Sequence, residues 1–145
     1  MIGLIQRVST ASVVVSGSTI ASIGPGLLVL VGIEREDSRA LVERLAHKLL
    51  HYRVFSDSEG KMNCNVMEQS GDLLLVPQFT LAADTRKGLR PSFNGAPPDV
   101  ATSLFDELVE MVTNQYRAPG TGQFGADMSV SLCNDGPVTF WLQVN

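Results

Sequence analysis

The chain has 145 residues, of which 44% are hydrophobic and 18% are charged, and its formal net charge is −4. This length predicts one compact domain over residues 1–145, and the acidic balance argues against a non-specific nucleic-acid binder, because phosphates attract clustered Lys and Arg. With no leader pattern, no membrane-length apolar run and no C-x-x-C motif from Cys64 and Cys133, we expect a cytoplasmic protein without a membrane partner.

The N-terminal half is predicted to form strands followed by a helix. The run from Leu27 to Ile33 is continuously apolar, as expected of a strand buried on both faces. Asp37 or Ser38 can cap a helix that runs to about Leu50 with apolar residues at helical spacing. The strands expected in this half are Ile2–Val8, Ser12–Val15, Thr19–Ile23 and Leu27–Ile33.

The C-terminal half is predicted to contain a second helix and three more strands. The helix is expected from Asp99 to just before Ala118. A strand before Pro77 is interrupted by that proline, and Gly136-Pro137 is expected in the connection between the last two strands. These strands are Leu73–Val76, Phe124–Leu132 and Val138–Val144. The fold class that follows is α+β, a single mainly β domain with two main helices.

Two clusters of polar residues have ordinary structural explanations. His47 and His51 are four positions apart on the first predicted helix, which is the spacing of two metal ligands on one face. No third ligand is visible nearby, so we favour a solvated or partly buried pair and expect no metal site. The basic run 85–91 contains Arg86, Lys87 and Arg90, and the sequence leaves open whether it is a solvated loop or a phosphate contact.

The sequence lacks the common signatures of side-chain nucleophiles. It has no G-x-S-x-G elbow and no P-loop, and no base is convincingly paired with Thr80. If the chain is an enzyme, its catalysis is therefore predicted to depend on backbone donors and on positioning.

Two short runs in the sequence are unusual. Gly136-Pro137 combines a residue that lets another backbone come close with the one residue at which a cis bond costs little, although a tight turn is the ordinary explanation of a lone Gly-Pro. This run, Asn134 to Thr139, and the run Pro77 to Leu81 resemble the two signatures of D-aminoacyl-tRNA deacylases. The usual forms are Asn-x-Gly-Pro-Val-Thr and Ser-Gln-Phe-Thr-Leu.

The resemblance extends over the whole chain. Chain length and motif order also match, and together the matches are more specific than either signature alone. The shorter matching runs are Ile5–Val8, Phe55–Asp57, Gly60–Asn63, Ala83–Thr85, Arg90–Phe93 and Phe124–Met128.

The resemblance implies a barrel-like mixed sheet and a homodimer that hydrolyses the ester between a D-amino acid and the terminal ribose of tRNA. It implies an active site across the dimer interface, no cofactor and no DNA partner. Gly136 and Pro137, joined by a cis bond, would enter the pocket of the other subunit and reject L substrates by a clash. Because glycine has no side chain to clash, glycyl-tRNA is expected to be admitted in some measure.

The other signature would form the floor of the site. Phe79 and Thr80 would donate backbone N–H groups to the developing oxyanion, each such donor lowering the barrier by about 3 kcal/mol. Gln78 belongs to the same catalytic run, and water would attack with help from the ribose 2′-hydroxyl of the substrate. Phe124 and Met128 match pocket residues of the family and are expected on one strand face, with plain core packing as the alternative.

Pro77 departs from the family pattern, which has serine at this position. Proline has neither a hydroxyl nor an amide hydrogen, so the residue cannot act as a nucleophile or bind substrate through a hydroxyl.

Three alternatives to the main hypothesis stay open: a paralogous deacylase with another substrate range, a non-catalytic dimer that binds tRNA ends or a small ligand, and an esterase that depends on the Thr80 side chain.

Overall fold

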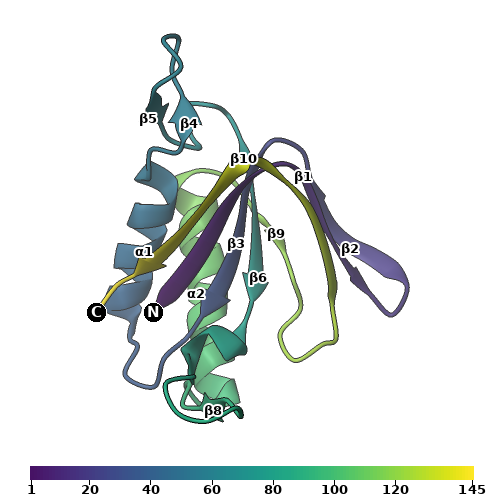
Figure 1. Cartoon of the computed structure of the whole chain (residues 1–145), viewed down its shortest axis with the longest axis vertical. Coiled ribbons are helices and arrows are strands. Elements are labelled where there is room, and N and C mark those ends of the chain that lie inside the picture. The colour runs from purple at the N-terminus through teal and green to yellow at the C-terminus, as the bar shows by residue number, and fades with distance from the viewer.

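A computed structural model describes all residues, 1–145, in ten β-strands, two α-helices and one short 3-10 helix (Figure 1). Six strands form the main sheet, in the order β10-β1-β3-β6-β9, with β2 also paired to β1. The pairs among β10, β1, β2 and β3 are antiparallel, and β3, β6 and β9 run parallel, so the sheet is mixed. Its strands are β1 Ile2–Val15, β2 Ser18–Ile23, β3 Gly26–Gly32, β6 Asp72–Pro77, β9 Gly120–Thr121 and β10 Ser129–Gln143.

The two helices pack together on one face of this sheet (Figure 1). Of the two predicted caps, Ser38 is the N-cap residue of α1, although its side chain forms no cap hydrogen bond. Both helices begin and end close to their predicted bounds. Neither helix is long and apolar enough to cross a membrane. The helices and the small elements are α1 Arg39–His51, α2 Pro98–Gln115, the 3-10 helix η1 Phe79–Ala82, the strand pair β4 Phe55–Ser56 and β5 Met62–Cys64, and the strand pair β7 Ala83–Asp84 and β8 Ser92–Phe93.

On the face opposite the helices, the sheet curls so that its own strands enclose a second apolar cluster. A second apolar cluster, which includes Val13, Leu28 and Leu74, fills the space between β1, β3, β6 and β2. A Cβ placed on Gly120 of β9 would lie 3.4 Å from the Cβ of Ala21 on β2, so these two strands lie close together. The sheet thus curls into a nearly closed barrel-like form, and the predicted α+β class with two helices is confirmed.

Two predicted strand boundaries were wrong for the same reason. The predicted strands at 2–8 and 12–15 are parts of one strand, β1, whose register to β10 shifts on either side of Val8. The predicted strand at 138–144 begins earlier, because β10 continues through Gly136 and Pro137. In both cases an irregularity within a strand resembles a strand end in the sequence, because it breaks the alternation of side chains.

Gly136 and Pro137 lie in a wide bulge of the edge strand β10. Gln6 pairs with Thr139 and Val8 pairs with Asn134, so residues 135–138 of β10 oppose a single residue of β1. The Gly136-Pro137 peptide bond is cis, and both residues are exposed. We call residues 135–138 the Gly-Pro bulge.

The prediction of a strand at 124–128 was also wrong. Phe124 and Gly125 form a turn, in which Gly125 has a φ of +74° and Ala126 N–H donates to the carbonyl of Gln123 over 3.3 Å. The alternation of apolar residues there matches an alternation of burial, since Phe124, Ala126 and Met128 are half-buried and Gly125 and Asp127 are exposed.

Pro77 is the last residue of β6, and the N–H group that proline lacks costs the sheet no hydrogen bond. The N–H of Gln78 donates to the carbonyl of Val31 on β3 over 2.8 Å. Successive residues of a strand direct their N–H groups to opposite neighbours, so the N–H that Pro77 lacks would face β9, which has already ended at Thr121. Proline is therefore compatible with this position.

Candidate functional site

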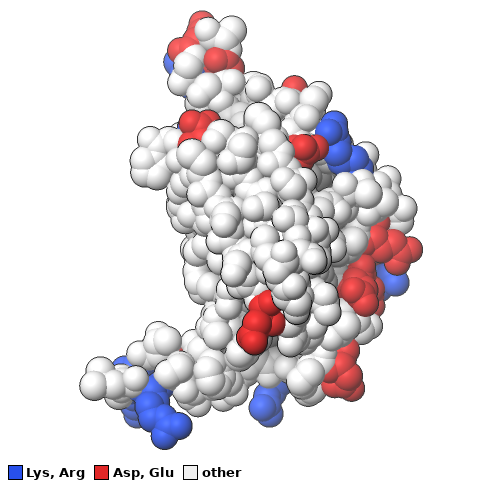
Figure 2. All heavy atoms as spheres, turned by 90° about the vertical axis from the view of Figure 1, so that its right-hand side faces the viewer, with Lys and Arg blue, Asp and Glu red and all other residues white.

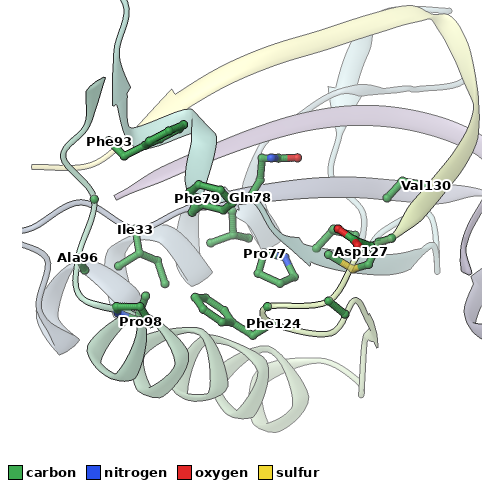
Figure 3. Close-up of a pocket in the computed structure, with 17 residues that line it drawn as sticks. Ile33, Pro77, Gln78, Phe79, Phe93, Ala96, Pro98, Phe124, Asp127 and Val130 are labelled. Atoms are coloured by element: carbon green, nitrogen blue, oxygen red, sulfur yellow. The ribbon is translucent and has the colours of Figure 1, made fainter. Parts of the chain in front are cut away.

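A cavity of about 560 Å³ opens where the parallel strands β3 and β6 end (Figure 3). It lies between η1, the N-terminal end of α2 and the segment 122–130, and most of its lining is apolar. A largely apolar cavity of this size with few polar groups is typical of sites that bind small organic groups.

The cavity brings together five of the residues singled out in the sequence. Pro77, Gln78 and Phe79 line it from β6 and η1, and Phe124 and Met128 line it from the other side (Figure 3). Phe124 lies in a turn and Met128 in a loop, so the prediction that they share one strand face was wrong. Their role as pocket residues for a substrate stays a prediction.

The other three singled-out residues do not line this cavity. Thr80 follows Phe79 in η1 but is not among the lining residues. Its hydroxyl accepts a hydrogen bond of 2.5 Å from the side-chain amide of Gln78. Gly136 and Pro137 belong to the bulge on β10 and are not among the lining residues of their own chain.

Side-chain nucleophiles are missing from the cavity wall. Among its 17 lining residues there is no Ser, Thr, Tyr, Cys, His or Lys, and the polar side chains are those of Gln78 and Asp127. His47 and His51 stack on each other on α1, with ring centroids 4.1 Å apart, and neither lines the cavity. The groups of this chain that could take part in chemistry in the cavity are therefore backbone groups and the side chains of Gln78 and Asp127.

Gly122 allows the wall to close around Pro77 and Met128. A Cβ on Gly122 would lie 2.9 Å from the sulfur of Met128 and 3.1 Å from Cδ of Pro77, both tighter than ordinary contacts. The sulfur of Met128 also accepts the N–H of Gln123 over 3.3 Å. The sequence did not indicate a role for Gly122, because its contact with Pro77 joins segments that are far apart in the chain.

Arg7 is a second residue that sequence reasoning did not assign to the site, and it holds the Gly-Pro bulge. Its Nε donates to the carbonyl of Asp135 over 3.0 Å, and its Nη1 donates to the carbonyl of Val54 over 2.7 Å. The Arg7 side chain is only 14% exposed, whereas that of Asp135 is 61% exposed. The mostly buried Arg7 side chain thus fixes the backbone of the bulge, while Asp135, Gly136 and Pro137 remain exposed.

Asn134 fixes the same bulge from within its own strand. Its Oδ1 accepts the N–H of Val138 over 2.9 Å, and its Nδ2 donates to Oγ1 of Thr139 over 2.9 Å. An asparagine that bonds its own backbone across a bulge explains why this residue stands at the first position of the run.

One carboxyl beside the cavity has a strongly shifted pKa. Asp84 of β7 accepts hydrogen bonds from the side chain and from the backbone N–H of Arg86, and these bonds hold the pKa of its carboxyl well below the usual range. The bidentate pair fixes the start of the basic run predicted at 85–91.

Comparison with solved structures places this architecture in a known fold. The chain is similar to the c-Myc DNA Unwinding Element Binding Protein, with a TM-score of 0.96, 39% sequence identity and coverage of 100% of this chain and 99% of that one. It also resembles the structure of a probable eukaryotic D-amino acid tRNA deacylase, with a TM-score of 0.85 over 99% and 98% of the two chains. At 18% identity, the second likeness shows the fold alone.

Sequence comparison defines the family. The family model described as D-Tyr-tRNA(Tyr) deacylase matches residues 4–143. The chain is 58% identical to the D-aminoacyl-tRNA deacylase of Hydrogenovibrio crunogenus, with 99% of each chain covered. It is 61% identical to the D-aminoacyl-tRNA deacylase of Shewanella putrefaciens, over 99% of this chain and 100% of the relative. The chain therefore belongs to the D-Tyr-tRNA(Tyr) deacylase family.

Proposed function

We propose that this protein hydrolyses the ester of D-aminoacyl-tRNA, releasing the free D-amino acid and tRNA, and leaves L-aminoacyl-tRNA intact. The observation that carries the proposal is the cavity formed by the family signature at Pro77, Gln78 and Phe79 in a chain of this family. We assign the activity to residues 1–145 as one domain. Its place is the cytoplasm, where tRNA is charged and used.

The proposed chemistry uses backbone donors and a group of the substrate. Phe79 and Thr80 are the first two residues of η1, and the N–H groups in the first turn of a helix have no intrahelical acceptor. They would stabilise the oxyanion that forms when water attacks the ester carbonyl, with the vicinal 2′-hydroxyl of the ribose assisting. No metal or cofactor is assigned a part in this reaction. Because the cavity lining contains no Ser, Thr, Tyr, Cys, His or Lys, it supports a mechanism that depends on backbone donors.

Gln78 and the apolar wall would position the substrate. The Gln78 side chain lines the cavity and also donates to Thr80, so it links the catalytic run to the ligand space. Phe124 and Met128 would form the opposite wall, and Pro77 would contribute an apolar surface where the family usually has a serine hydroxyl. Substrate contact at Pro77 is thus confined to packing.

We assign chiral selection to Gly136 and Pro137 acting on a second copy of the chain. These residues do not line the cavity of their own chain, so they reach a cavity only across a dimer interface. Strand β10 is an edge strand and exposes several large apolar side chains, a surface suited to a second copy. These side chains and their exposed fractions are Leu132 38%, Phe140 38% and Trp141 51%.

The proposal is tested by measuring deacylation of D-Tyr-tRNA, L-Tyr-tRNA and glycyl-tRNA side by side. We expect rapid release from D-Tyr-tRNA, measurable release from glycyl-tRNA and none above background from L-Tyr-tRNA. Release of glycine alone would instead indicate a paralogous deacylase with another substrate range. Saturable tRNA binding without turnover of any substrate would indicate a non-catalytic protein that binds tRNA ends.

A further inference from the structure

A basic hairpin projects beside the mouth of the cavity. It consists of residues 83–93, in which β7 and β8 pair and Gly88, with a φ of +72°, lies near the tip. Arg86, Lys87 and Arg90 lie on it, and its one acidic residue is Asp84. In Figure 2 a group of Lys and Arg atoms projects from the end of the molecule at which β8 lies in Figure 1.

The positive charge of this hairpin is available to a ligand. Arg86 is held by Asp84 through bonds of 2.8 and 2.7 Å, and its side chain remains 86% exposed. Lys87 and Arg90 form no ion pair with any residue of the chain. Three cations thus gather within five residues of a chain whose formal net charge is −4. Such a local excess favours an anionic partner at this place.

Two exposed aromatic rings connect the basic hairpin to the cavity. Phe79 and Phe93 have ring centroids 5.4 Å apart and are 63% and 57% exposed. Both also line the cavity, at its edge next to η1 and β8 (Figure 3). We call them the Phe79–Phe93 pair. Large aromatic rings that stay this exposed beside a binding cavity offer a surface on which a further flat group can stack.

We propose that the basic hairpin and the Phe79–Phe93 pair form a subsite for the single-stranded nucleotides that precede the terminal adenosine of tRNA. A basic surface that follows the phosphates, next to aromatic rings that stack with bases, is the combination that binds single-stranded nucleic acid. A base next to the terminal nucleotide stacks on Phe93, and Lys87 and Arg90 contact its phosphates. This inference rests on the proposed function, because it assumes that the terminal nucleotide occupies the cavity.

The decisive experiment compares a long and a short substrate. The double variant Lys87→Ala/Arg90→Ala is assayed on D-Tyr-tRNA and on the D-tyrosyl ester of adenosine, which has no preceding nucleotide. We expect kcat/KM to fall about tenfold for D-Tyr-tRNA and to stay unchanged for the adenosine ester. On the tRNA substrate the slope of log kcat/KM against log salt should become shallower by about 1.4, since each phosphate contact to a single strand contributes about 0.7.

A matched control removes the same charges elsewhere. Arg39→Ala/Lys61→Ala takes one Arg and one Lys from α1 and from the loop between β4 and β5, where these side chains are 72% and 69% exposed. In Figure 1 the β4–β5 pair and β8 lie at opposite ends of the molecule. This variant should keep the rates and the salt slope of the unchanged protein. An equal loss in both double variants would mean that only net charge matters, which overturns the subsite.

Phe93→Leu separates stacking from charge. It removes the ring but keeps an apolar side chain, so binding of an oligoribonucleotide ending in CCA should weaken about tenfold without a change in salt slope. Unchanged binding in this variant, or tighter competition by an acidic peptide than by the oligoribonucleotide, would contradict the proposal. An oligodeoxyribonucleotide of the same sequence that binds better than RNA would assign the subsite to DNA instead.

The results also separate the inference from the proposed function. If the unchanged protein hydrolyses both substrates and the hairpin variant loses nothing on tRNA, the subsite is wrong and the function stands. If the unchanged protein hydrolyses neither, the function is wrong, and the same variants are then judged by oligoribonucleotide binding alone. A parallel loss on both substrates would mean that the substitutions damage the cavity, which also overturns the subsite.

Discussion

Thr80 carries a hydroxyl within the family signature, yet its surroundings do not equip it as a nucleophile. The hydroxyl accepts a hydrogen bond from Gln78, and the two histidines of the chain stack on α1, away from the cavity lining. A serine or threonine nucleophile needs a base that removes its proton. At the scale of single residues, the structure therefore favours the backbone of η1 over its side chains.

Substitution of Thr80 by Ala tests this assignment. Thr80→Ala keeps the backbone N–H and removes only the hydroxyl, so we expect kcat/KM on D-Tyr-tRNA to fall less than about tenfold. Removing a true side-chain nucleophile costs on the order of 10⁴-fold or more. A loss of that size, measured at unchanged thermal stability, would support the side-chain esterase. Asp127→Asn, which removes the carboxylate among the lining residues, is assayed beside it with the same expectation.

Gly136→Ala tests the role of the Gly-Pro bulge. The added Cβ would lie 2.6 Å from Cγ2 and 2.9 Å from the backbone N of Val138, at a φ of +140°. The bulge must therefore shift, and we expect selectivity between D- and L-Tyr-tRNA to fall at least about tenfold, with a loss of about 1–3 kcal/mol in the free energy of unfolding.

Gly17→Ala is the matched control for this substitution. Gly17 also has a positive φ, +78°, but a Cβ there would meet no atom within 4 Å. It should lower stability to a similar extent and leave selectivity unchanged. If both variants alter selectivity equally, the effect comes from general destabilisation, and the role of the bulge is not supported.

At the scale of elements, a charged cluster joins the start of β1, the segment before α1 and the end of β10. The α-amino group of Met1 donates to Oε2 of Glu34 over 2.8 Å, to Oδ1 of Asp37 over 2.6 Å and to the carbonyl of Val144 over 2.9 Å. Gln143 of β10 donates to both carboxylate oxygens of Glu34. The cluster closes the sheet at the end where the two termini of the chain lie (Figure 1).

This cluster predicts a loss of stability in acid. Partial burial raises the pKa of Glu34, but the hydrogen bonds from the Met1 amino group and from Gln143 outweigh it, so the pKa lies below the ordinary value. The contribution of Glu34 to stability is therefore complete above the unfolded pKa and is lost as the pH falls through the folded one. In the unfolded chain the pKa of a Glu carboxyl is about 4.3. Glu34→Gln should therefore reduce the difference in the free energy of unfolding between pH 6 and pH 3, measured by urea unfolding.

A second carboxyl with a lowered pKa provides the control for this experiment. Asp57 also has a lowered pKa, because Asn63 and the backbone N–H groups of Lys61 and Glu59 donate to its carboxylate. It lies in the loop between β4 and β5, an end of the molecule remote from the two termini in Figure 1. Asp57→Asn is therefore the control, and if it removes more of the pH dependence than Glu34→Gln does, the cluster at Met1 is not the main source.

For the whole molecule, the proposed dimer is expected to form through the edge strand β10. We expect the unchanged protein to sediment as a dimer. Trp141→Glu places a charge in the exposed apolar surface of β10, so we expect this variant to sediment as a monomer and to lose activity in parallel. Val100→Glu, at a 40% exposed position on α2, should leave the dimer intact. Unchanged association of the Trp141 variant would place the interface elsewhere.

Several helices and strands could be predicted because they depend on patterns of neighbouring residues. Continuous apolar runs identified β3 and β6, and the two candidate caps Asp37 and Ser38 with helical spacing after them identified α1. The bulges around Val8 and at 135–138 could not be recognised, because only the pairing of β1 with β10 shows that each strand continues. Likewise the turn at Phe124 was mistaken for a strand, because a short irregular segment can alternate like one.

Some residues of the candidate site could also be identified from the sequence, and others only from long-range contacts. The family resemblance singled out Pro77, Phe79, Phe124 and Met128, and all four line the cavity, while their roles toward a substrate stay predictions. Arg7 was not assigned a role, because the bond from Arg7 to the carbonyl of Asp135 joins residues 128 positions apart. Long-range contacts of this kind depend on the register of paired strands, which one sequence does not reveal.

The most direct test of the account is the ratio of initial deacylation rates on D-Tyr-tRNA and L-Tyr-tRNA, measured at one concentration of the unchanged protein. Exclusion of the L side chain by a rigid backbone predicts a ratio of at least about 100, equivalent to about 2.7 kcal/mol of difference between the two barriers. A ratio near one, or no release of either amino acid, would contradict the assignment of this protein as a chirality-selective deacylase.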